Sequence, residues 1–348
     1  MKKTIYSIIL VALLGLRGAA QDFQFTQYFA TPLLLNPALT GYIPDAEKGE
    51  RGGGISPDGR LALAYRSQYY RNVPDYDGAT AMVDWRRCIA CVNCGKSRSF
   101  WAIGLLLQGD RSPFAHFSQA RAGVSGAFHL GLGRNASMSV GGSAAFFNFG
   151  FDPSGLRFDE QFDGIGFNAN VGRAEPLLGT DKRRSQLDLN AGLNVTFPVR
   201  GGQLTAGLAF YHLKPVAYTL STSGNQLGLG TGFYVTHEIQ GWTSRVFWRR
   251  QSMFGQQSRQ HQVLLGTMRN FKGPFALGMM TRINNHWRQP LRFEGLIPMF
   301  QLRSGPWIFL ASYDVPLSSV RRVAAGALEL SAQYVFGQFG RCVYCPGM

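Results

Sequence analysis

The stretch that decides the fold is Gln186 to Pro198, which reads Gln-Leu-Asp-Leu-Asn-Ala-Gly-Leu-Asn-Val-Thr-Phe-Pro. Apolar side chains stand at every second position, with a polar residue or a glycine between them. A β-strand sends alternate side chains to opposite faces of its sheet, so this stretch predicts a strand with one apolar and one polar face. Residues 324–336 repeat the pattern with Leu328, Leu330 and Tyr334 on the apolar face.

The same alternation recurs from residue 60 to 336 in about fourteen segments. We place them at 60–69, 78–86, 99–108, 118–131, 136–149, 186–198, 203–212, 226–237, 243–251, 260–270, 275–284, 291–302, 307–315 and 324–336. A soluble β-sandwich would also alternate, but its strands are usually shorter, whereas strands of about nine to thirteen residues suit a tilted crossing of a membrane. Large aromatic residues gather at segment ends, as in the girdles of membrane barrels: Trp85, Trp101, Trp242, Trp248, Trp287, Trp307, Tyr334 and Phe336. The sequence therefore predicts an all-β fold, an outer-membrane β-barrel of about fourteen antiparallel strands.

Composition agrees with this fold class. Of 348 residues, 45% are hydrophobic and only 16% are charged, and 43 are glycine. This balance excludes a disordered chain, and the lack of a 20-residue apolar run after the first twenty residues excludes a polytopic helical membrane protein. The formal net charge is +15. Because the chain carries an export signal, we expect its arginines to meet anionic lipid, a pore or an acidic protein, and we expect no nucleic-acid partner.

The export signal occupies residues 1–20. Lys2 and Lys3 precede a short apolar run that ends before Gly18-Ala19-Ala20, which is the pattern of a cleavable secretory signal peptide. We divide the rest of the chain into an amino-terminal plug or periplasmic segment at 21–59, the barrel at 60–336 and a periplasmic tail at 337–348. If the barrel begins in the periplasm, the compact glycine turns fall on the periplasmic side, and the long connections 150–185 and 213–225 fall outside.

Residues 21–41 are apolar, but Pro32, Pro37 and Gly41 interrupt any strand or long helix. A segment this apolar must pack against protein, so we expect it inside the barrel or at its periplasmic mouth, as a plug or docking strip. The residues assigned to that role are Phe23, Phe25, Tyr28, Phe29, Leu35, Asn36 and Pro37.

The same residues carry a family resemblance. Gln21-Asp22-Phe23-Gln24-Phe25-Thr26-Gln27-Tyr28, followed by Leu35-Asn36-Pro37-Ala38, resembles the opening of the PorP/SprF family of outer-membrane proteins of the type IX secretion system. Phe23 and Thr26 depart from it, since the family has proline and serine there. Weaker matches follow at 64–69, 76–79, 156–163, 187–192 and 211–213.

The resemblance implies an outer-membrane component or accessory of type IX secretion. Its partners would be the secretion and gliding machinery and a secreted surface protein, such as a gliding adhesin, whose export or attachment it supports. The alternative is a passive porin, which needs an open lumen with a charged constriction. Lumen-facing positions are rich in glycine, serine and asparagine, and the segment 21–41 is long enough to fill the lumen.

Five cysteines form two clusters, Cys88, Cys91 and Cys94, and then Cys342 and Cys345. Both clusters fall on the predicted periplasmic side, and closing the barrel would bring them together. Disulfides that clip the mouth are the favoured interpretation in an oxidising compartment, and zinc, an iron–sulfur cluster or free thiols remain alternatives. One cysteine is left over in any pairing.

Other candidate sites are weaker. The acidic run 158–163 could offer oxygen ligands to calcium, but a solvated loop tip is the favoured interpretation, because the spacing of a known calcium-binding loop is absent. The six histidines are scattered, and no hydrolase or phosphate-binding motif is present, so we expect no enzyme activity, no cofactor and no small-molecule substrate. Tyr334 and Phe336 resemble the terminal aromatic signal that directs barrel insertion, although lipid-facing packing would explain them as well.

Overall fold

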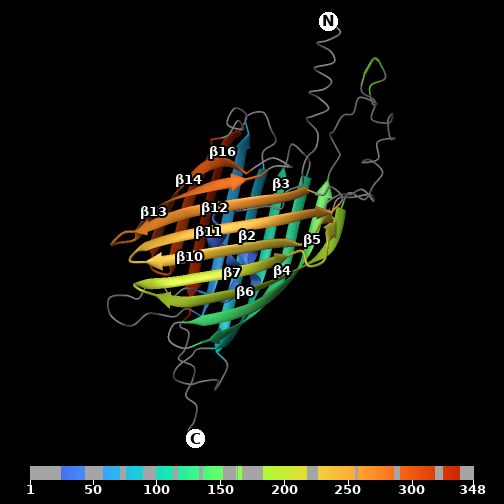
Figure 1. Cartoon of the computed structure of the whole chain (residues 1–348). Coiled ribbons are helices and arrows are strands. Elements are labelled where there is room, and N and C mark those ends of the chain that lie inside the picture. Colours follow the sequence, from blue (N-terminus) through green and yellow to red (C-terminus); the bar gives the residue numbers. More distant parts are fainter. Residues whose placement is uncertain are drawn as a thin grey trace.

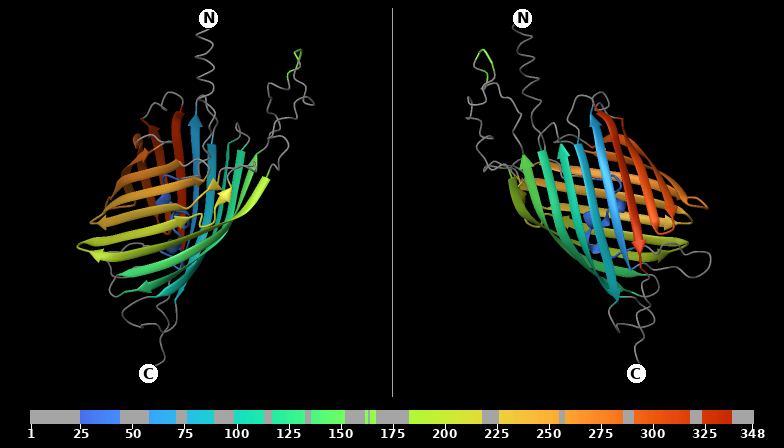
Figure 2. Two further views of the ribbon diagram at one scale, coloured as in Figure 1. Left: turned by 45° about the vertical axis from the view of Figure 1, so that its right-hand side comes forward. Right: turned by 180° about the vertical axis from the view of Figure 1, so that it is seen from behind.

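The structure, a computed structural model, describes residues 25–43, 58–70, 76–88, 99–112, 117–132, 136–151, 162, 164–166, 183–217, 226–254, 258–285, 291–317 and 324–337. These residues form a closed antiparallel barrel (Figure 1, Figure 2). Within this part of the chain the sheet has 16 strands, and β8 (Val216–Ala217) and β9 (Gln226–Leu227) contain two residues each.

The remaining fourteen strands form the wall. They are β1 (Gly59–Tyr70), β2 (Tyr76–Cys88), β3 (Phe100–Ser112), β4 (Phe117–Gly131), β5 (Ser137–Phe151), β6 (Arg183–Val199), β7 (Gly202–Tyr211), β10 (Gly230–Ile239), β11 (Trp242–Phe254), β12 (Ser258–Asn270), β13 (Phe275–Asn284), β14 (Arg292–Ser304), β15 (Trp307–Pro316) and β16 (Ala324–Phe336). The predicted barrel and its approximate strand number are confirmed. One predicted strand, 226–237, is interrupted, because Gly228 and Leu229 separate β9 from β10.

Closure joins the first strand to the last. β1 pairs with β16 from Gly59 opposite Phe336 to Tyr70 opposite Ala324. Every other long strand pairs with its neighbours along the chain, and the β10–β11 pairing completes the ring. A closed ring leaves no sheet edge in lipid, which is the condition that a spanning sheet must meet.

The two ends of the barrel differ in their connections. Two-residue turns join β6 to β7, β10 to β11 and β14 to β15, and we call this the turn end. Gly201 and Gly241 take positive φ values of 79° and 80° there, which glycine adopts without steric cost. The opposite end, which we call the loop end, carries the longer connections 152–182 and 212–229.

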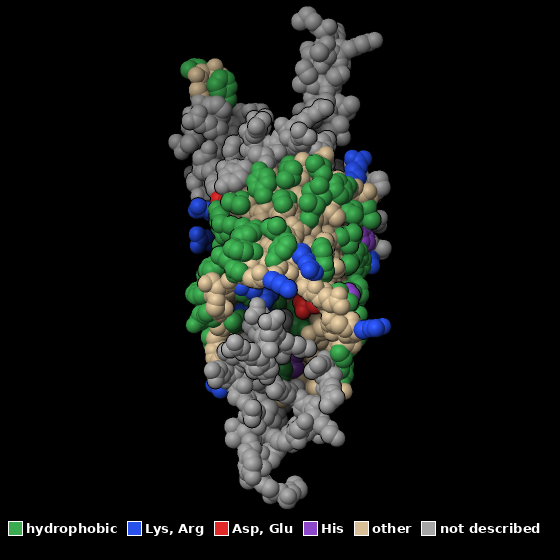
Figure 3. Space-filling model, turned by 90° about the vertical axis from the view of Figure 1, so that its left-hand side faces the viewer, with side chains coloured by type: hydrophobic (Ala, Val, Ile, Leu, Met, Phe, Trp, Pro, Cys, Tyr) green, Lys and Arg blue, Asp and Glu red, His purple; other side chains and the backbone are tan. Residues whose placement is uncertain are grey.

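The alternation of β6 is confirmed residue by residue. Leu187 and Leu193 are 39% and 47% exposed on the outside, whereas Asp188 and Asn194 are buried on the inside. Hydrophobic side chains cover much of the outer wall in Figure 3, as a lipid-facing surface requires. Among the described residues, no helix is long and apolar enough to span a bilayer.

The lumen holds residues 25–43, which we call the luminal segment. It consists of three short turns, η1 (Tyr28–Ala30), α2 (Pro32–Leu35) and η2 (Pro37–Leu39). Proline begins both α2 and η2, where its missing N–H costs no helical hydrogen bond. The Asn36 side chain caps η2 by accepting from the backbone N–H of Ala38, at 2.8 Å.

The luminal face of the wall is not uniformly polar, which corrects the sequence-based expectation. On β10–β15 a large part of it is apolar and packs against the luminal segment, beside polar positions such as Arg282, Ser312 and Asp314. The buried cluster comprises Tyr28, Ala30, Leu35, Leu39, Tyr234, Phe247, Leu264, Met268, Ala276, Met280, Ile297, Met299 and Leu310. On β5 and β6 the expectation holds, because Gly141 and Gly192 let the segment approach the sheet.

Candidate functional site in the barrel lumen

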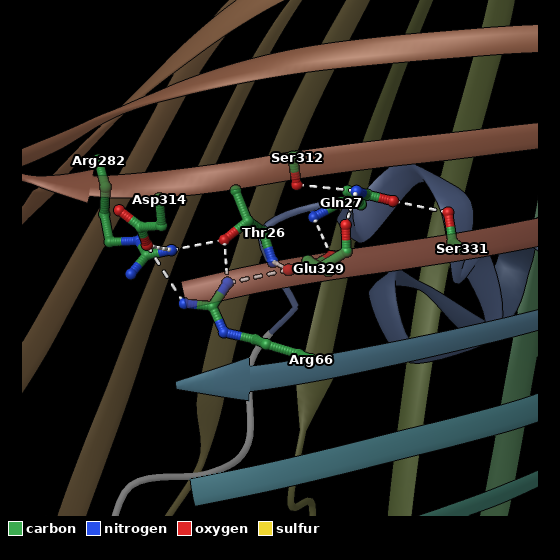
Figure 4. Close-up of polar contacts among 8 residues, drawn as sticks. All are labelled: Thr26, Gln27, Arg66, Arg282, Ser312, Asp314, Glu329 and Ser331. Carbon is green, nitrogen blue, oxygen red and sulfur yellow. Dashed lines mark hydrogen bonds and ion pairs between the residues drawn. The ribbon is translucent and has the colours of Figure 1, made fainter. Parts of the chain in front are cut away.

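Four buried charges meet in the half of the lumen nearer the loop end (Figure 4). The Arg66 guanidinium lies 2.9 Å from the Glu329 carboxylate and 3.2 Å from that of Asp314. Arg282 lies 2.6 Å from the same Asp314 oxygen. Two cations and two anions compensate one another, and this is what allows Arg66 and Glu329 to be 2% and 1% exposed.

This charge cluster holds the start of the luminal segment. Glu329 accepts hydrogen bonds from the backbone N–H groups of Thr26 and Gln27, at 2.8 and 2.7 Å. The Gln27 amide donates to Ser312 at 2.8 Å and accepts from Ser331 at 2.6 Å. One carboxylate therefore satisfies two backbone donors and one arginine, so the docking of the segment and the neutrality of the cluster depend on each other.

A second ion pair holds the other end of the segment. The Gly41 N–H donates to Asp84 at 2.7 Å, and Asp84 also lies 2.7 Å from the Arg60 guanidinium. Arg60 further donates to the Tyr42 carbonyl oxygen, at 3.4 Å. Because Arg60 stands one residue after the first residue of β1, this anchor lies near the turn end.

Between these anchors, Asn36 binds directly to the backbone of the wall. Its amide nitrogen donates to the carbonyl oxygens of Leu193 on β6 and Leu208 on β7, at 2.9 and 3.3 Å. A Cβ added at Gly192 would come within 1.8 Å of the Asn36 side-chain oxygen. Glycine at this strand position is therefore what admits Asn36.

Aromatic contacts fix the segment against the apolar half of the lumen. The Tyr28 ring stacks on Phe247 of β11, with centroids 4.8 Å apart. The Arg245 guanidinium lies over the Phe29 ring, 4.1 Å from its centroid, which is the geometry of a cation–π contact.

The structure places six of the seven assigned plug residues within the luminal segment. These are Phe25, Tyr28, Phe29, Leu35, Asn36 and Pro37. Phe29 is partly exposed and the other five are buried. Phe23 lies outside the described residues. What the segment does there stays a proposal.

The cysteine hypothesis is not tested by the described residues. Cys88 is the last residue of β2, while Cys91, Cys94, Cys342 and Cys345 lie outside the described part of the chain. Within the described part, no group of three or more histidine, cysteine, aspartate or glutamate side chains is placed to hold a metal ion. Of the acidic run 158–163, only Phe162 is described.

The terminal aromatics lie where the last strand reaches the turn end. Tyr334 faces Leu61 of β1 and Trp307 of β15 in the strand register. The Tyr334 ring lies 4.7 Å from that of Trp307 and 6.2 Å from that of Phe336. The three rings form one outward aromatic patch, and its role in assembly stays a prediction.

Sequence reasoning did not single out the charged residues that hold the luminal segment. Glu329 stands between Leu328 and Leu330 in a membrane strand, and Asp84 stands between Val83 and Trp85. A charge at a luminal position in the middle of an otherwise apolar strand was the available signal. It did not identify the partners, because Glu329 and Gln27 lie 302 residues apart.

Comparison with known proteins agrees with this geometry. A family model described as "Type IX secretion system membrane protein PorP/SprF" matches residues 54–334. No curated protein matches the chain.

Solved structures with a similar fold include a transporter and a channel for aromatic hydrocarbons. The toluene transporter TbuX of Ralstonia pickettii is 11% identical, with a TM-score of 0.53, and the match covers 92% of this chain and 96% of that one. The monoaromatic hydrocarbon channel CymD is also 11% identical, with a TM-score of 0.50 and coverage of 93% and 96%. At this identity the likeness concerns the fold alone.

Proposed function

The chain belongs to the PorP/SprF family of type IX secretion membrane proteins, and from this premise we propose that it is an outer-membrane accessory barrel that supports export or surface attachment of a secreted protein. A gliding adhesin is the kind of secreted protein that we expect it to serve. Its other partners are the type IX secretion machinery and the lipid of the outer membrane.

The observation that carries the proposal is the family match together with the occupied lumen. A passive porin conducts through a water-filled lumen with a charged constriction. Here the luminal charges Arg66, Glu329, Asp84 and Arg60 instead bind one another and the backbone of the luminal segment. The interior charges are used to dock a segment, which favours a scaffold over a pore.

Deletion of the gene tests the proposal in cells. We expect at least one secreted protein to leave the cell surface and to accumulate inside the envelope, while general porin function is unchanged. Restoring the wild-type gene should restore export, and a variant that lacks residues 21–41 should not, at matched barrel abundance. Normal surface display of every secreted protein in the deletion strain would contradict the proposal.

Conductance separates the proposal from the porin alternative. Purified full-length protein in a planar bilayer is expected to show no steady open current, whereas the variant lacking residues 21–41 should conduct. Steady porin-like current through the wild-type barrel, combined with normal export in the deletion strain, would favour the porin.

A further inference from the structure

An arginine stands on the outer, lipid-facing side of the wall near the turn end, where β11, β12 and β13 run side by side (Figure 1). In the strand register Arg269 of β12 lies between Trp242 of β11 and Leu277 of β13, which are 46% and 53% exposed. The preceding residue, Met268, is buried in the luminal cluster, so alternation places Arg269 on the outside. A charge on this face is costly at the middle of the membrane and much less so at the interface. Arg269 therefore lies at the height of the lipid headgroups.

Two contacts to the neighbouring hairpin hold the Arg269 side chain in place. Its Nη1 donates to the Gln240 carbonyl oxygen at 2.9 Å, and its guanidinium lies 5.1 Å from the centroid of the Trp242 ring. Gln240 and Gly241 have positive φ values of 46° and 80°, as a tight turn with two left-handed central residues requires. A guanidinium has five N–H donors, of which the contact to Gln240 uses one. The side chain is therefore held in one orientation and has further donors to offer to an anion.

A second cation lies in the connection between β12 and β13. Lys272 is exposed there, and the connection is closed by a hydrogen bond from the Phe271 N–H to the Phe275 carbonyl oxygen, at 3.1 Å. The side chains of Phe271 and Phe275 are 51% and 49% exposed. Aromatic side chains on a barrel wall gather at the membrane interface, and basic side chains there attract anionic lipids. Lys272 and Arg269 therefore offer two positive charges at the level of the headgroups.

Two hydroxyl groups lie on the same face, closer to the middle of the wall. Ser244 and Thr267 are exposed, stand opposite each other in the register, and have their hydroxyl oxygens 3.5 Å apart. Each stands two residues from the pair of Trp242 and Arg269, which is about 7 Å along a strand. In a phospholipid the ester carbonyls lie between the phosphate and the acyl chains, and a carbonyl oxygen accepts hydrogen bonds from hydroxyl groups. The position of the two hydroxyls therefore suits these esters.

The next pair along these strands is apolar. Val246 and Leu265 stand opposite each other and are 40% and 37% exposed. From the turn end inward, the outer face of β11 and β12 thus presents a cation, then hydroxyls, then apolar side chains, which is the order of phosphate, ester and acyl chain in a phospholipid. The β14–β15 turn offers a comparison, because the outward side chains of Trp307 and Phe309 there are both aromatic and stack on each other, with centroids 5.7 Å apart.

We propose that the outer face of β11–β13 at the turn end binds one anionic phospholipid of the adjoining leaflet. Arg269 and Lys272 bind its phosphate through charge-assisted hydrogen bonds. The hydroxyls of Ser244 and Thr267 donate to its ester carbonyls, and its acyl chains lie against the apolar pair beyond them. This inference goes beyond the proposed function, because it concerns the lipid-facing wall and holds whichever protein the barrel helps to export.

Lipid titration followed by native mass spectrometry tests the headgroup contacts. The full-length protein in detergent micelles is titrated with dioleoyl phosphatidylglycerol, which is anionic, and with dioleoyl phosphatidylcholine, which is zwitterionic. We expect one phosphatidylglycerol to bind about tenfold more tightly than phosphatidylcholine, which is the usual worth of one hydrogen bond to a charged group. Arg269→Gln should abolish this preference, and Arg269→Lys should keep most of it. Arg200→Gln, an exposed change at the β6–β7 turn, should leave the preference unaltered.

Ether-linked phosphatidylglycerol tests the ester contacts. This lipid keeps the headgroup but lacks both carbonyl oxygens, so the wild type should bind it about threefold to tenfold more weakly than the ester lipid. The double variant Ser244→Ala/Thr267→Val should bind the two lipids alike and still prefer the anionic headgroup. Ser118→Ala, which removes an exposed hydroxyl at the loop end, should bind as the wild type does. Unchanged heat-modifiable migration in gels shows that each barrel is folded.

The outcomes decide for or against this lipid site. Equal binding of phosphatidylglycerol and phosphatidylcholine, or a wild-type preference in Arg269→Gln, overturns it. An equal loss of preference in Arg200→Gln would indicate attraction by the basic turn end as a whole, and that result overturns the site as well. Loss of the headgroup preference in Arg269→Gln alone, together with loss of the ester preference in the Ser244/Thr267 double variant alone, supports it.

Discussion

Glu329→Gln is expected to loosen the luminal segment. Glu329 accepts from the backbone of Thr26 and Gln27 and pairs with Arg66, at distances of 2.7 to 2.9 Å. The amide keeps the shape of the side chain but removes its charge, and it places a donor where the wild type has only acceptors. The buried cluster changes from neutral to a net single positive charge.

The size of the effect follows from burial. Glu329 is 1% exposed and Arg66 is 2% exposed, so water does not replace the lost partner. Breaking one side of a buried pair costs about 3–5 kcal/mol. If that cost falls on docking, the undocked population rises by about 100-fold or more, since each 1.4 kcal/mol is a factor of ten.

Thiol labelling measures this population. The five native cysteines are replaced by serine, and Leu34→Cys, a partly buried position on the luminal segment, supplies the single thiol. When docking equilibrates faster than labelling, the maleimide reaction rate reports the undocked fraction. Glu329→Gln should raise that rate by about 100-fold. Ser331→Ala, which removes one neutral hydrogen bond to Gln27, should raise it about tenfold or less.

A double variant supplies the decisive control. Arg66→Gln/Glu329→Gln leaves the Arg282–Asp314 pair, which is neutral by itself. The double variant should therefore be labelled more slowly than Glu329→Gln alone, because the uncompensated buried charge is gone. Wild-type labelling of Glu329→Gln, or faster labelling of the double variant than of the single one, would refute the reasoning.

Three further expectations concern other parts of the barrel. Gly192→Ala should destabilise the barrel by about 1–3 kcal/mol in urea titrations of the heat-modifiable form, because its Cβ would meet Asn36 at 1.8 Å. Gly142→Ala, where the nearest atom is 3.7 Å away, should lower the unfolding free energy much less. Equal destabilisation by the two variants would contradict this expectation. Phe336→Asp should lower the amount of folded barrel in outer-membrane fractions, and unchanged abundance would rule out an assembly role for this side chain. Peptide mapping without reductant should find a disulfide between the cluster Cys88, Cys91 and Cys94 and the cluster Cys342 and Cys345. Only local pairs, or free thiols, would contradict this disulfide. Labelling of these thiols from outside intact cells would overturn the predicted orientation of the barrel.

The strands themselves could be predicted because their signal is local. In β6, successive side chains from Leu187 to Phe197 point alternately to the lipid and to the interior, and this pattern can be recognised without knowledge of distant residues. Two-residue turns could also be predicted from the local sequence, since Gly201 and Gly305 stand at the turn positions. Ring closure was expected because a sheet that spans a membrane can leave no edge unpaired in lipid.

The luminal contacts could not be predicted in the same way. Alternation shows that a strand has a second face, but not whether water or protein covers it. The interior faces of β10–β15 carry Met268, Met280 and Ile297 because the luminal segment packs on them. From the sequence alone, a strand with apolar side chains on both faces cannot be distinguished from a strand whose alternation is irregular.

Composition and spacing alone predict a membrane wall of alternating strands and an apolar amino-terminal segment that must be buried, because apolar side chains are driven out of water. Which charges compensate one another depends on the closed ring, because Arg66 and Glu329 are 263 residues apart in the sequence and meet only when β1 pairs with β16. The end of β7 also depends on a neighbouring strand, since His212, with a φ of 54°, is held by Asp188 and Asn190 of β6. Contacts between charges that are distant in the sequence, and contacts between neighbouring strands, arise only in the closed barrel, and no local pattern of residues encodes them.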